Sequence, residues 1–132
     1  MDYFKDLDNV HAVAKATRKW ADKNKHKNDF PDDLCGMCAI ASAKLHDDLR
    51  EKGITDAEIA YNEGHCFVLW KGLVFDVTAT QFGKKQKVFV APFEDVKEER
   101  WYKIERTFVT STALRKHQVK EKWPLEQLRL ND

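Results

Sequence analysis

The sequence contains little of what marks membrane, secreted or nucleic-acid-binding proteins. No apolar run approaches the roughly 18 residues that a membrane-spanning helix needs, and the start, Met1-Asp2-Tyr3-Phe4-Lys5-Asp6, lacks the basic and then apolar order of a secretory signal. The 23 basic and 22 acidic residues leave a formal net charge of +1, so no overall field recruits nucleic acid or acidic lipid. We therefore expect a cytoplasmic protein that binds neither nucleic acid nor membrane.

Cysteine, proline and glycine are also scarce, at 3, 3 and 5 of 132 residues. An odd number of cysteines without an export signal argues for free thiols rather than a disulfide framework. The chain has no repeat, low-complexity tract or interdomain linker. Because 42% of the residues are apolar and 11% aromatic, the chain can form a substantial core, and we expect one domain over residues 1–132.

Two stretches in the first half have the spacing of amphipathic helices. Apolar residues recur every three or four positions from Phe4 to Ala21, which predicts a helix over residues 4–22. A second helix is predicted over residues 37–52, where Gly53 follows as a stop. Four of its residues share one face: Cys38, Ala41, Leu45 and Leu49.

From residue 58 onwards the pattern changes to that of β-strands. Strands are predicted over residues 58–61, 65–70, 73–77, 87–91 and 101–109, and a last short helix from about Thr110 to residue 122. We therefore expect an α+β fold with N-terminal helices, the second bearing Cys38. These helices would pack on an antiparallel sheet of four or five strands.

The dipeptide Lys71-Gly72 predicts a two-residue hairpin turn, which would pair Trp70 with Leu73. In that register His65 and Asp76 are diagonal neighbours on one face of the sheet, within reach of a bond between a carboxylate and an imidazole nitrogen. A three-residue loop would reverse the parity and separate them. The inferred contact therefore depends on the turn.

Cys38 is the first candidate for a reactive residue, because a thiol at the start of a helix meets unpaired N–H groups and a partial positive charge. Both favour the thiolate, which is the nucleophile. His65 and Asp76 then follow in the chain order nucleophile, base and orienting acid. An acid between Phe75 and Val77 in a buried strand is costly without a partner, which favours a functional role for Asp76.

Three motifs in this order resemble the core of the transglutaminase-like branch of the papain-like thiol enzymes. They are Gly36-Met37-Cys38 opening a helix that ends at Gly53-Ile54, then Gly64-His65, then Phe75-Asp76-Val77-Thr78. The resemblance covers about residues 34–82 and implies Cys38 as nucleophile, His65 as general base and acid, and Asp76 as the orienting group. In papain itself the histidine lies well over 100 residues downstream, whereas His65 follows Cys38 after 27 positions. The short spacing favours the transglutaminase-like branch.

The resemblance implies a thiol enzyme that cleaves or transfers an acyl group of a protein or peptide substrate through an acyl-enzyme, without a cofactor or metal. Backbone N–H groups at the start of the Cys38 helix would face the oxyanion. Weaker candidates for substrate or oxyanion contacts are Met37, Thr78 and Gln81. If water attacks the acyl-enzyme, the protein is a peptidase or deamidase; if an amine attacks it, the protein is a transamidase. A domain this small has little room for a second substrate cleft, so we expect hydrolysis.

Three other interpretations stay open. Cys35 and Cys38 with His65 and Cys66 have the right atoms for structural zinc, although the neighbouring strand residues His65 and Cys66 point to opposite faces. The run Cys35-Gly36-Met37-Cys38 also resembles a dithiol redox motif, but no apolar strand precedes it. The third interpretation is a degenerate thiol-enzyme fold used only for binding. For Cys38 alone, the alternative to a nucleophile is a small buried hydrophobe.

Overall fold

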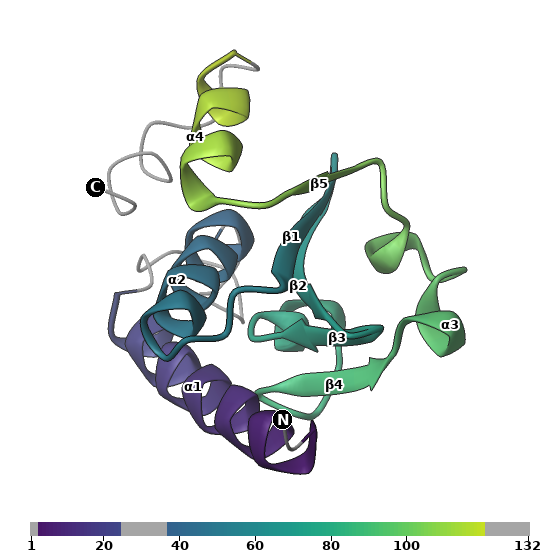
Figure 1. The fold of residues 1–132 in the computed structure, drawn as a ribbon. Coiled ribbons are helices and arrows are strands. Elements are labelled where there is room, and N and C mark those ends of the chain that lie inside the picture. The colour runs from purple at the N-terminus through teal and green to yellow at the C-terminus, as the bar shows by residue number, and fades with distance from the viewer. Residues whose placement is uncertain (1–2, 25–36, 121–132) are drawn as a thin grey trace.

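Helices and strands form separate layers in the computed structural model, which describes residues 3–24 and 37–120 (Figure 1). Helices α1 (Tyr3–Asn24) and α2 (Cys38–Glu51) pack against a five-stranded sheet. Its strands are β1 (Ala57–Asn62), β2 (His65–Trp70), β3 (Leu73–Asp76), β4 (Phe89–Pro92) and β5 (Arg106–Phe108). The predicted α+β fold, with Cys38 on the second helix, is confirmed.

The sheet has the strand order β4-β3-β2-β1-β5, and all neighbouring strands are antiparallel. In the β2–β3 hairpin, Trp70 pairs with Leu73 and Val68 with Phe75, as the two-residue turn predicts. Lys71 and Gly72 form this turn with φ angles of 48° and 79°. Two consecutive left-handed residues match the twist of the flanking strands, so the turn fixes the register.

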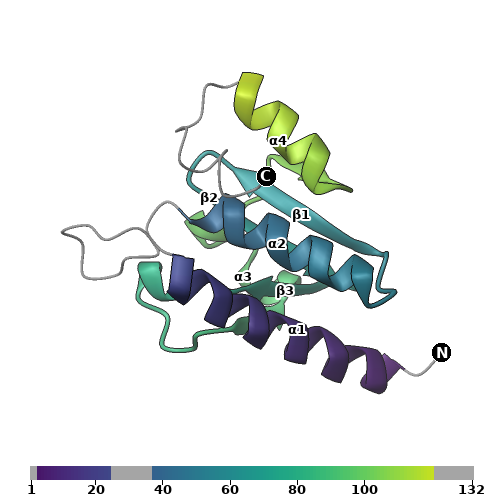
Figure 2. The same cartoon turned by 90° about the vertical axis from the view of Figure 1, so that its left-hand side faces the viewer.

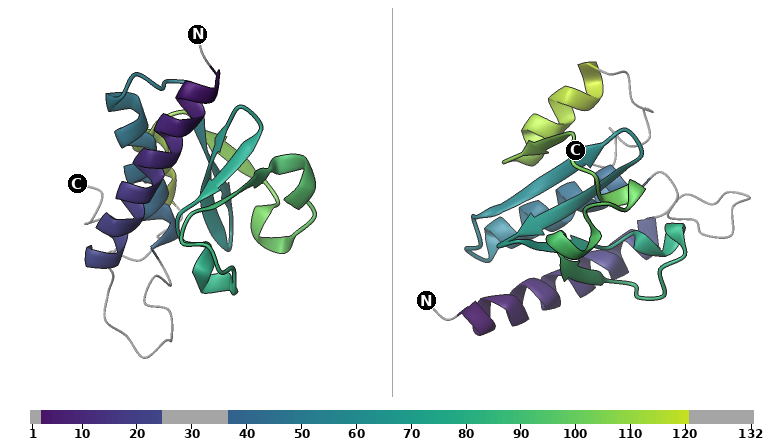
Figure 3. Two further views of the ribbon diagram at one scale, coloured as in Figure 1. Left: turned by 90° about the horizontal axis from the view of Figure 1, so that it is seen from below. Right: turned by 90° about the vertical axis from the view of Figure 1, so that its right-hand side faces the viewer.

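Buried side chains cover both faces of the sheet, and Figure 3 shows α1 and α2 on one side and α3 (Phe93–Val96) on the other. On the helical side the core includes Leu45, Val68 and Phe75. On the other side Phe67 and Val74 pack with Val96 and Tyr102. The central strands are therefore apolar almost without interruption, as strands buried on both faces are.

Helix α2 lies between α1 and α4 (Ser111–Lys120), as Figure 2 shows. Its bounds lie within one residue of the prediction, and Gly53 follows it with a φ of 85°. The predicted start of the last helix is also confirmed, because the Thr110 hydroxyl accepts a hydrogen bond from the Ala113 N–H at 3.1 Å. The predicted extension of this helix to residue 122 lies outside the described residues.

Arg18 connects α1 to the segment that follows β3. Its side chain is buried, and Nη1 donates to the carbonyl oxygens of Val77 and Lys87 at 3.1 and 3.2 Å and to the Thr80 hydroxyl at 3.1 Å. Nε donates to Asp22 at 3.1 Å. A buried guanidinium needs such partners, and here they join two parts of the chain that are far apart in sequence.

The prediction of one long strand over residues 101–109 is wrong for its first half. Residues Arg100–Tyr102 form a 3₁₀ turn, η2, and only Arg106–Phe108 pair with β1. The alternation of Tyr102 and Ile104 with charged residues imitates a strand. Here Asn62 donates to the carbonyl oxygens of Trp101 and Lys103, which holds the segment in another conformation. Two further short elements, η1 (Ala79–Phe82) and α3, were not predicted.

Across residues 3–24 and 37–120, no helix combines the length and the apolar character that crossing a membrane requires.

Candidate active site

The three candidate catalytic residues all lie at ends of secondary-structure elements. Cys38 is the first residue of α2, His65 the first of β2 and Asp76 the last of β3. The turn that joins β2 to β3 is at the opposite end of the hairpin, so His65 and Asp76 lie together at its open end. The fold thus brings together residues that are 38 positions apart in sequence.

His65 and Asp76 form a short, buried contact, with Nε2 of His65 2.6 Å from Oδ2 of Asp76. Their side chains are 0% and 1% exposed. This is the contact that the hairpin register predicts. A hydrogen bond between an imidazole and a carboxylate fixes the ring orientation, and its low-dielectric surroundings strengthen it.

Two other residues donate to the Asp76 carboxylate. Oδ1 accepts hydrogen bonds from the Thr78 N–H at 2.9 Å and from the Thr78 hydroxyl at 3.3 Å. Oδ2 accepts a hydrogen bond from the Tyr102 hydroxyl at 2.7 Å, in addition to the His65 contact. Four donors therefore satisfy a carboxylate that would be costly to bury alone.

The surroundings of His65 favour its protonated form. Burial pulls the pKa of His65 down, but the charge and hydrogen bond of Asp76, together with a smaller contribution from Cys38, raise it to about 9. Because Nε2 contacts Asp76, Nδ1 is the ring nitrogen left for Cys38. This buried atom has no hydrogen-bond partner in the described part of the chain.

The surroundings of Cys38 favour the thiolate. A hydrogen bond from the Cys66 thiol lowers the pKa of Cys38 most; burial opposes this effect, and the hydrogen bond and charge of His65 lower the pKa further, to well below its usual range. Met37 is the N-cap of α2 and its side chain makes no capping bond, and the partial positive charge at the start of a helix also favours negative charge on Cys38. The pKa shifts of Cys38 and His65 therefore both favour a thiolate beside an imidazolium.

Cys66, which the sequence suggested only as a candidate zinc ligand, interacts with Cys38 in the structure. Both cysteines belong to one buried cluster, with Ala39 and Ala43 from the first turns of α2. The hydrogen bond to Cys38 and burial raise the pKa of Cys66, so this residue stays a thiol and can donate. The sequence shows that Cys66 is next to His65, but it does not show that helix α2 packs over Cys66.

The weaker candidates differ in their surroundings. Met37 is fully buried in the core, and its carbonyl oxygen accepts a hydrogen bond from Ala41. Thr78 is buried and directs both of its donors to Asp76. Gln81 is half-buried, and its Nε2 has no hydrogen-bond partner among residues 3–24 and 37–120. Their contacts with substrate or oxyanion remain predictions.

Aromatic side chains adjoin His65. Phe82 meets its ring edge-on, with centroids 4.6 Å apart, and stacks on Trp101 at 3.9 Å. Both Phe82 and Trp101 are half-buried. Sequence reasoning missed Trp101 and Tyr102 as neighbours of the site because it placed them in a strand.

No group of three or more His, Cys, Asp or Glu side chains is arranged to hold a metal ion in the part of the chain that the structure describes. Cys35, which the zinc and dithiol interpretations require, lies outside the described residues.

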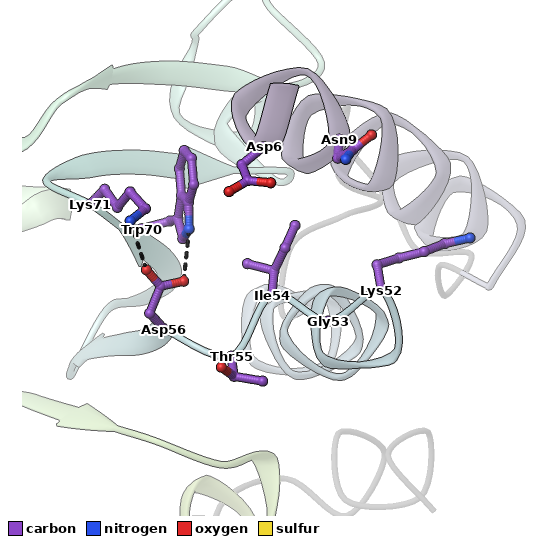
Figure 4. A pocket seen from close by; sticks show the side chains of 9 residues that line it. All are labelled: Asp6, Asn9, Lys52, Gly53, Ile54, Thr55, Asp56, Trp70 and Lys71. Atoms are coloured by element: carbon purple, nitrogen blue, oxygen red, sulfur yellow. Dashed lines mark hydrogen bonds and ion pairs between the residues drawn. The ribbon is translucent and has the colours of Figure 1, made fainter. Parts of the chain in front are cut away.

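A pocket of about 350 Å³ lies at the other end of α2 (Figure 4). Its lining includes Gly53, just beyond the last turn of the helix, and Trp70 at the end of β2. Asp56 accepts a hydrogen bond from Trp70 at 3.0 Å and forms an ion pair with Lys71 at 3.2 Å. A 14-residue helix is about 20 Å long, so this pocket is remote from Cys38.

Comparisons of this chain with models of known protein families, with curated proteins and with solved structures found no match.

Proposed function

We propose that this protein is a thiol enzyme that cleaves an amide or peptide bond through a Cys38–His65–Asp76 triad and an acyl-enzyme intermediate. The observation that supports it best is the buried 2.6 Å contact between Asp76 and His65, together with the position of Cys38, near enough that His65 and Cys38 shift each other's pKa. Burying three ionisable groups side by side is costly, and a fold that needed only packing would place apolar residues there. The same residues support membership of the transglutaminase-like branch of papain-like thiol enzymes.

The proposed reaction begins from the thiolate and imidazolium pair. The thiolate of Cys38 attacks the carbonyl carbon, a C–S bond forms, and the carbonyl oxygen becomes an oxyanion facing the N–H groups at the start of α2. When the C–N bond breaks, His65 gives its proton to the leaving amine. Water then loses a proton to His65 and attacks the thioester, and cleavage of the C–S bond restores the starting pair.

Asp76 holds His65 through both steps. Its contact with Nε2 leaves Nδ1 directed to the reacting atoms and stabilises the imidazolium. An amine in place of water would make the product a new amide, as in a transglutaminase. We favour water because the small domain offers little room for a second substrate, and a protein or peptide is the proposed acyl donor.

The test is alkylation by iodoacetamide at pH 7, followed residue by residue with mass spectrometry. We expect Cys38 to be labelled at least about tenfold faster than Cys66, because only the thiolate reacts and the pKa values of the two residues shift in opposite directions. Equally slow labelling of Cys35, Cys38 and Cys66 would contradict the proposal. Loss of the fast reaction in Cys38→Ser is the assignment control.

The carboxylate is tested by Asp76→Asn, which keeps the shape of the side chain and removes its charge. Without the charge His65 holds its proton less tightly, so the fast labelling of Cys38 at pH 7 should fall about tenfold. Thr78→Val is the matched control, since it removes only the longest of the four bonds to the carboxylate. An Asp76→Asn protein that folds and labels at the wild-type rate would exclude Asp76 from the triad.

A further inference from the structure

The hydroxyl of Tyr102 is bonded to the same oxygen of Asp76 as His65. The two distances to Oδ2 are 2.7 Å from the hydroxyl and 2.6 Å from Nε2, and all three side chains are at most 1% exposed. Burial and the Asp76 carboxylate raise the pKa of Tyr102, so the phenol stays protonated and keeps donating. Tyr102 lies beyond the stretch of about residues 34–82 that carries the family resemblance.

The position of Tyr102 is fixed from both sides by Asn62. Nδ2 of Asn62 donates to the carbonyl oxygens of Trp101 and Lys103, at 3.0 and 2.8 Å, which flank Tyr102 in the chain. Oδ1 of Asn62 accepts a hydrogen bond from the N–H of Gly64 at 2.8 Å, one residue before His65. One buried amide therefore joins the backbone beside Tyr102 to the backbone beside His65.

The ring of Tyr102 is also held by aromatic contacts. It stacks on Phe89 of β4 with centroids 5.6 Å apart and meets Phe67 of β2 edge-on at 5.1 Å. These contacts do not need the hydroxyl. Packing and hydrogen bonding at Tyr102 can therefore be separated by a change to phenylalanine.

We propose that Tyr102 is a positioning residue of the triad, which shares Oδ2 of Asp76 with His65 and so weakens the hold of the carboxylate on the imidazolium. The inference rests on the proposed function, because a moderated hold matters only if His65 must give its proton to a leaving amine. Each donor to a carboxylate disperses its charge, so an imidazolium that shares its acceptor oxygen is bound less firmly. Thr78, in contrast, donates to Oδ1, which His65 does not contact.

The groups that face His65 all enter this balance. They are Asp76, which raises the proton affinity of His65 most, Cys38, which raises it less, and the Tyr102 ring, which meets the imidazole at a centroid distance of 5.9 Å. Phe67 and Phe82 complete the surroundings and carry no charge. Removing the Tyr102 hydroxyl deletes its hydrogen bond to Asp76 and leaves the other groups around His65 in place.

The experiment is a titration of His65 by NMR in the wild type, Tyr102→Phe and Thr78→Val. In Tyr102→Phe the charge of Oδ2 is no longer shared, so His65 should bind its proton about threefold to tenfold more tightly. Thr78→Val should change this affinity less than twofold. An unchanged or weaker proton affinity in a folded Tyr102→Phe protein would overturn the proposal.

Two further measurements test the Tyr102 hydrogen bond and the reactivity of Cys38 independently of the titration. In the wild type, the Tyr102 hydroxyl proton should resonate downfield and exchange slowly with water, which tests the bond without any substitution; a rapidly exchanging proton would overturn the proposal. Iodoacetamide labelling of Cys38 in the wild type at pH 7 tests the proposed function separately, because only the thiolate reacts. If Cys38 of the wild type fails to label, the proposed function fails, while the titration still decides the role of Tyr102.

Discussion

Two buried histidines, in different regions of the molecule, meet opposite electrostatic surroundings. His46 lies in the third turn of α2 and its Nε2 bonds to the carbonyl oxygen of Ala57 at 3.0 Å. His65 lies at the start of β2 and its Nε2 bonds to the carboxylate of Asp76 at 2.6 Å. The two side chains are 1% and 0% exposed, so burial alone does not distinguish them.

The partner determines the protonation of each ring. Burial lowers the pKa of His46, and a neutral carbonyl oxygen does not make up for it. Burial also pulls the pKa of His65 down, but the full charge of Asp76 raises it to about 9. A buried histidine thus becomes a proton donor at neutral pH only where the fold also buries an acid beside it. The comparison separates a structural histidine from a candidate catalytic one.

The largest expected effect is on the reactivity of Cys38 when either histidine is changed to glutamine. In His65→Gln the thiol loses its imidazolium partner, so its labelling by iodoacetamide at pH 7 should fall about tenfold or more. In His46→Gln, on the same helix as Cys38, the rate should stay within about twofold of wild type. Mass spectrometry of time-quenched samples measures both rates.

The two glutamine variants control for each other, because each replaces a buried ring of the same size. Urea unfolding of both shows whether lost reactivity follows from lost stability. Equal losses of reactivity in the two folded variants would remove the distinction between the histidines.

An intermediate effect is expected in the pH dependence of stability. Between about pH 7 and 8 the unfolded chain holds one proton on the Cys38 thiol and none on His65, whereas the pKa shifts in the folded chain favour one proton on His65 and none on Cys38. The two states bind the same number of protons, so this pair contributes no pH dependence in that window. In Cys38→Ser only His65 of this pair titrates. Its raised pKa stabilises the folded state fully below pH 6.5, and this stabilisation is lost as the pH rises through the folded pKa of about 9.

We therefore expect the free energy of unfolding of Cys38→Ser, relative to wild type, to fall by on the order of 1 kcal/mol between pH 6 and pH 9. Urea unfolding at both pH values measures it, and subtracting the wild type cancels the other titrating groups. If the difference in unfolding free energy between the two proteins stayed constant with pH, His65 would be neutral at pH 6 to 7, as His46 is expected to be.

The smallest effect concerns the turn that keeps His65 opposite Asp76. Gly72 has a φ of 79°, and a side chain there would meet no atom within 4 Å, so Gly72→Ala should cost about 1 kcal/mol from backbone strain alone. Gly64→Ala, at the other end of β2, is the control, since its added Cβ would make only ordinary contacts at 3.6 and 3.9 Å. Thermal unfolding of both variants measures the difference in stability. His46 lies on α2, away from this turn, and should titrate as in the wild type.

Local pattern was sufficient to predict most of the elements and one decisive contact. The helices over residues 4–22 and 37–52 follow from the spacing of apolar residues, and their observed bounds differ by at most two residues. The His65–Asp76 contact follows from a two-residue turn, because the turn sets the parity of the hairpin. Both inferences rest on interactions between residues close in sequence.

The parts that could not be predicted depend on partners far apart in sequence. Tyr102 was assigned to a strand, because its alternation with charged neighbours is that of a half-buried strand. The Asn62 amide, about 40 residues away, holds this segment in a turn and directs the Tyr102 hydroxyl to Asp76. A buried tyrosine and a buried aspartate each need a partner, but the sequence does not say that they find each other.

Arg18 gives helix α1 a role beyond covering the sheet. The acceptors of its guanidinium, the carbonyl oxygens of Val77 and Lys87 and the Thr80 hydroxyl, begin one residue after Asp76. The first helix therefore restrains the backbone next to Asp76, although it contributes no residue to the proposed triad. A version of the protein shortened at its N-terminus would lose this restraint, and the contact between His65 and Asp76 should loosen even where α2 and the sheet remain folded.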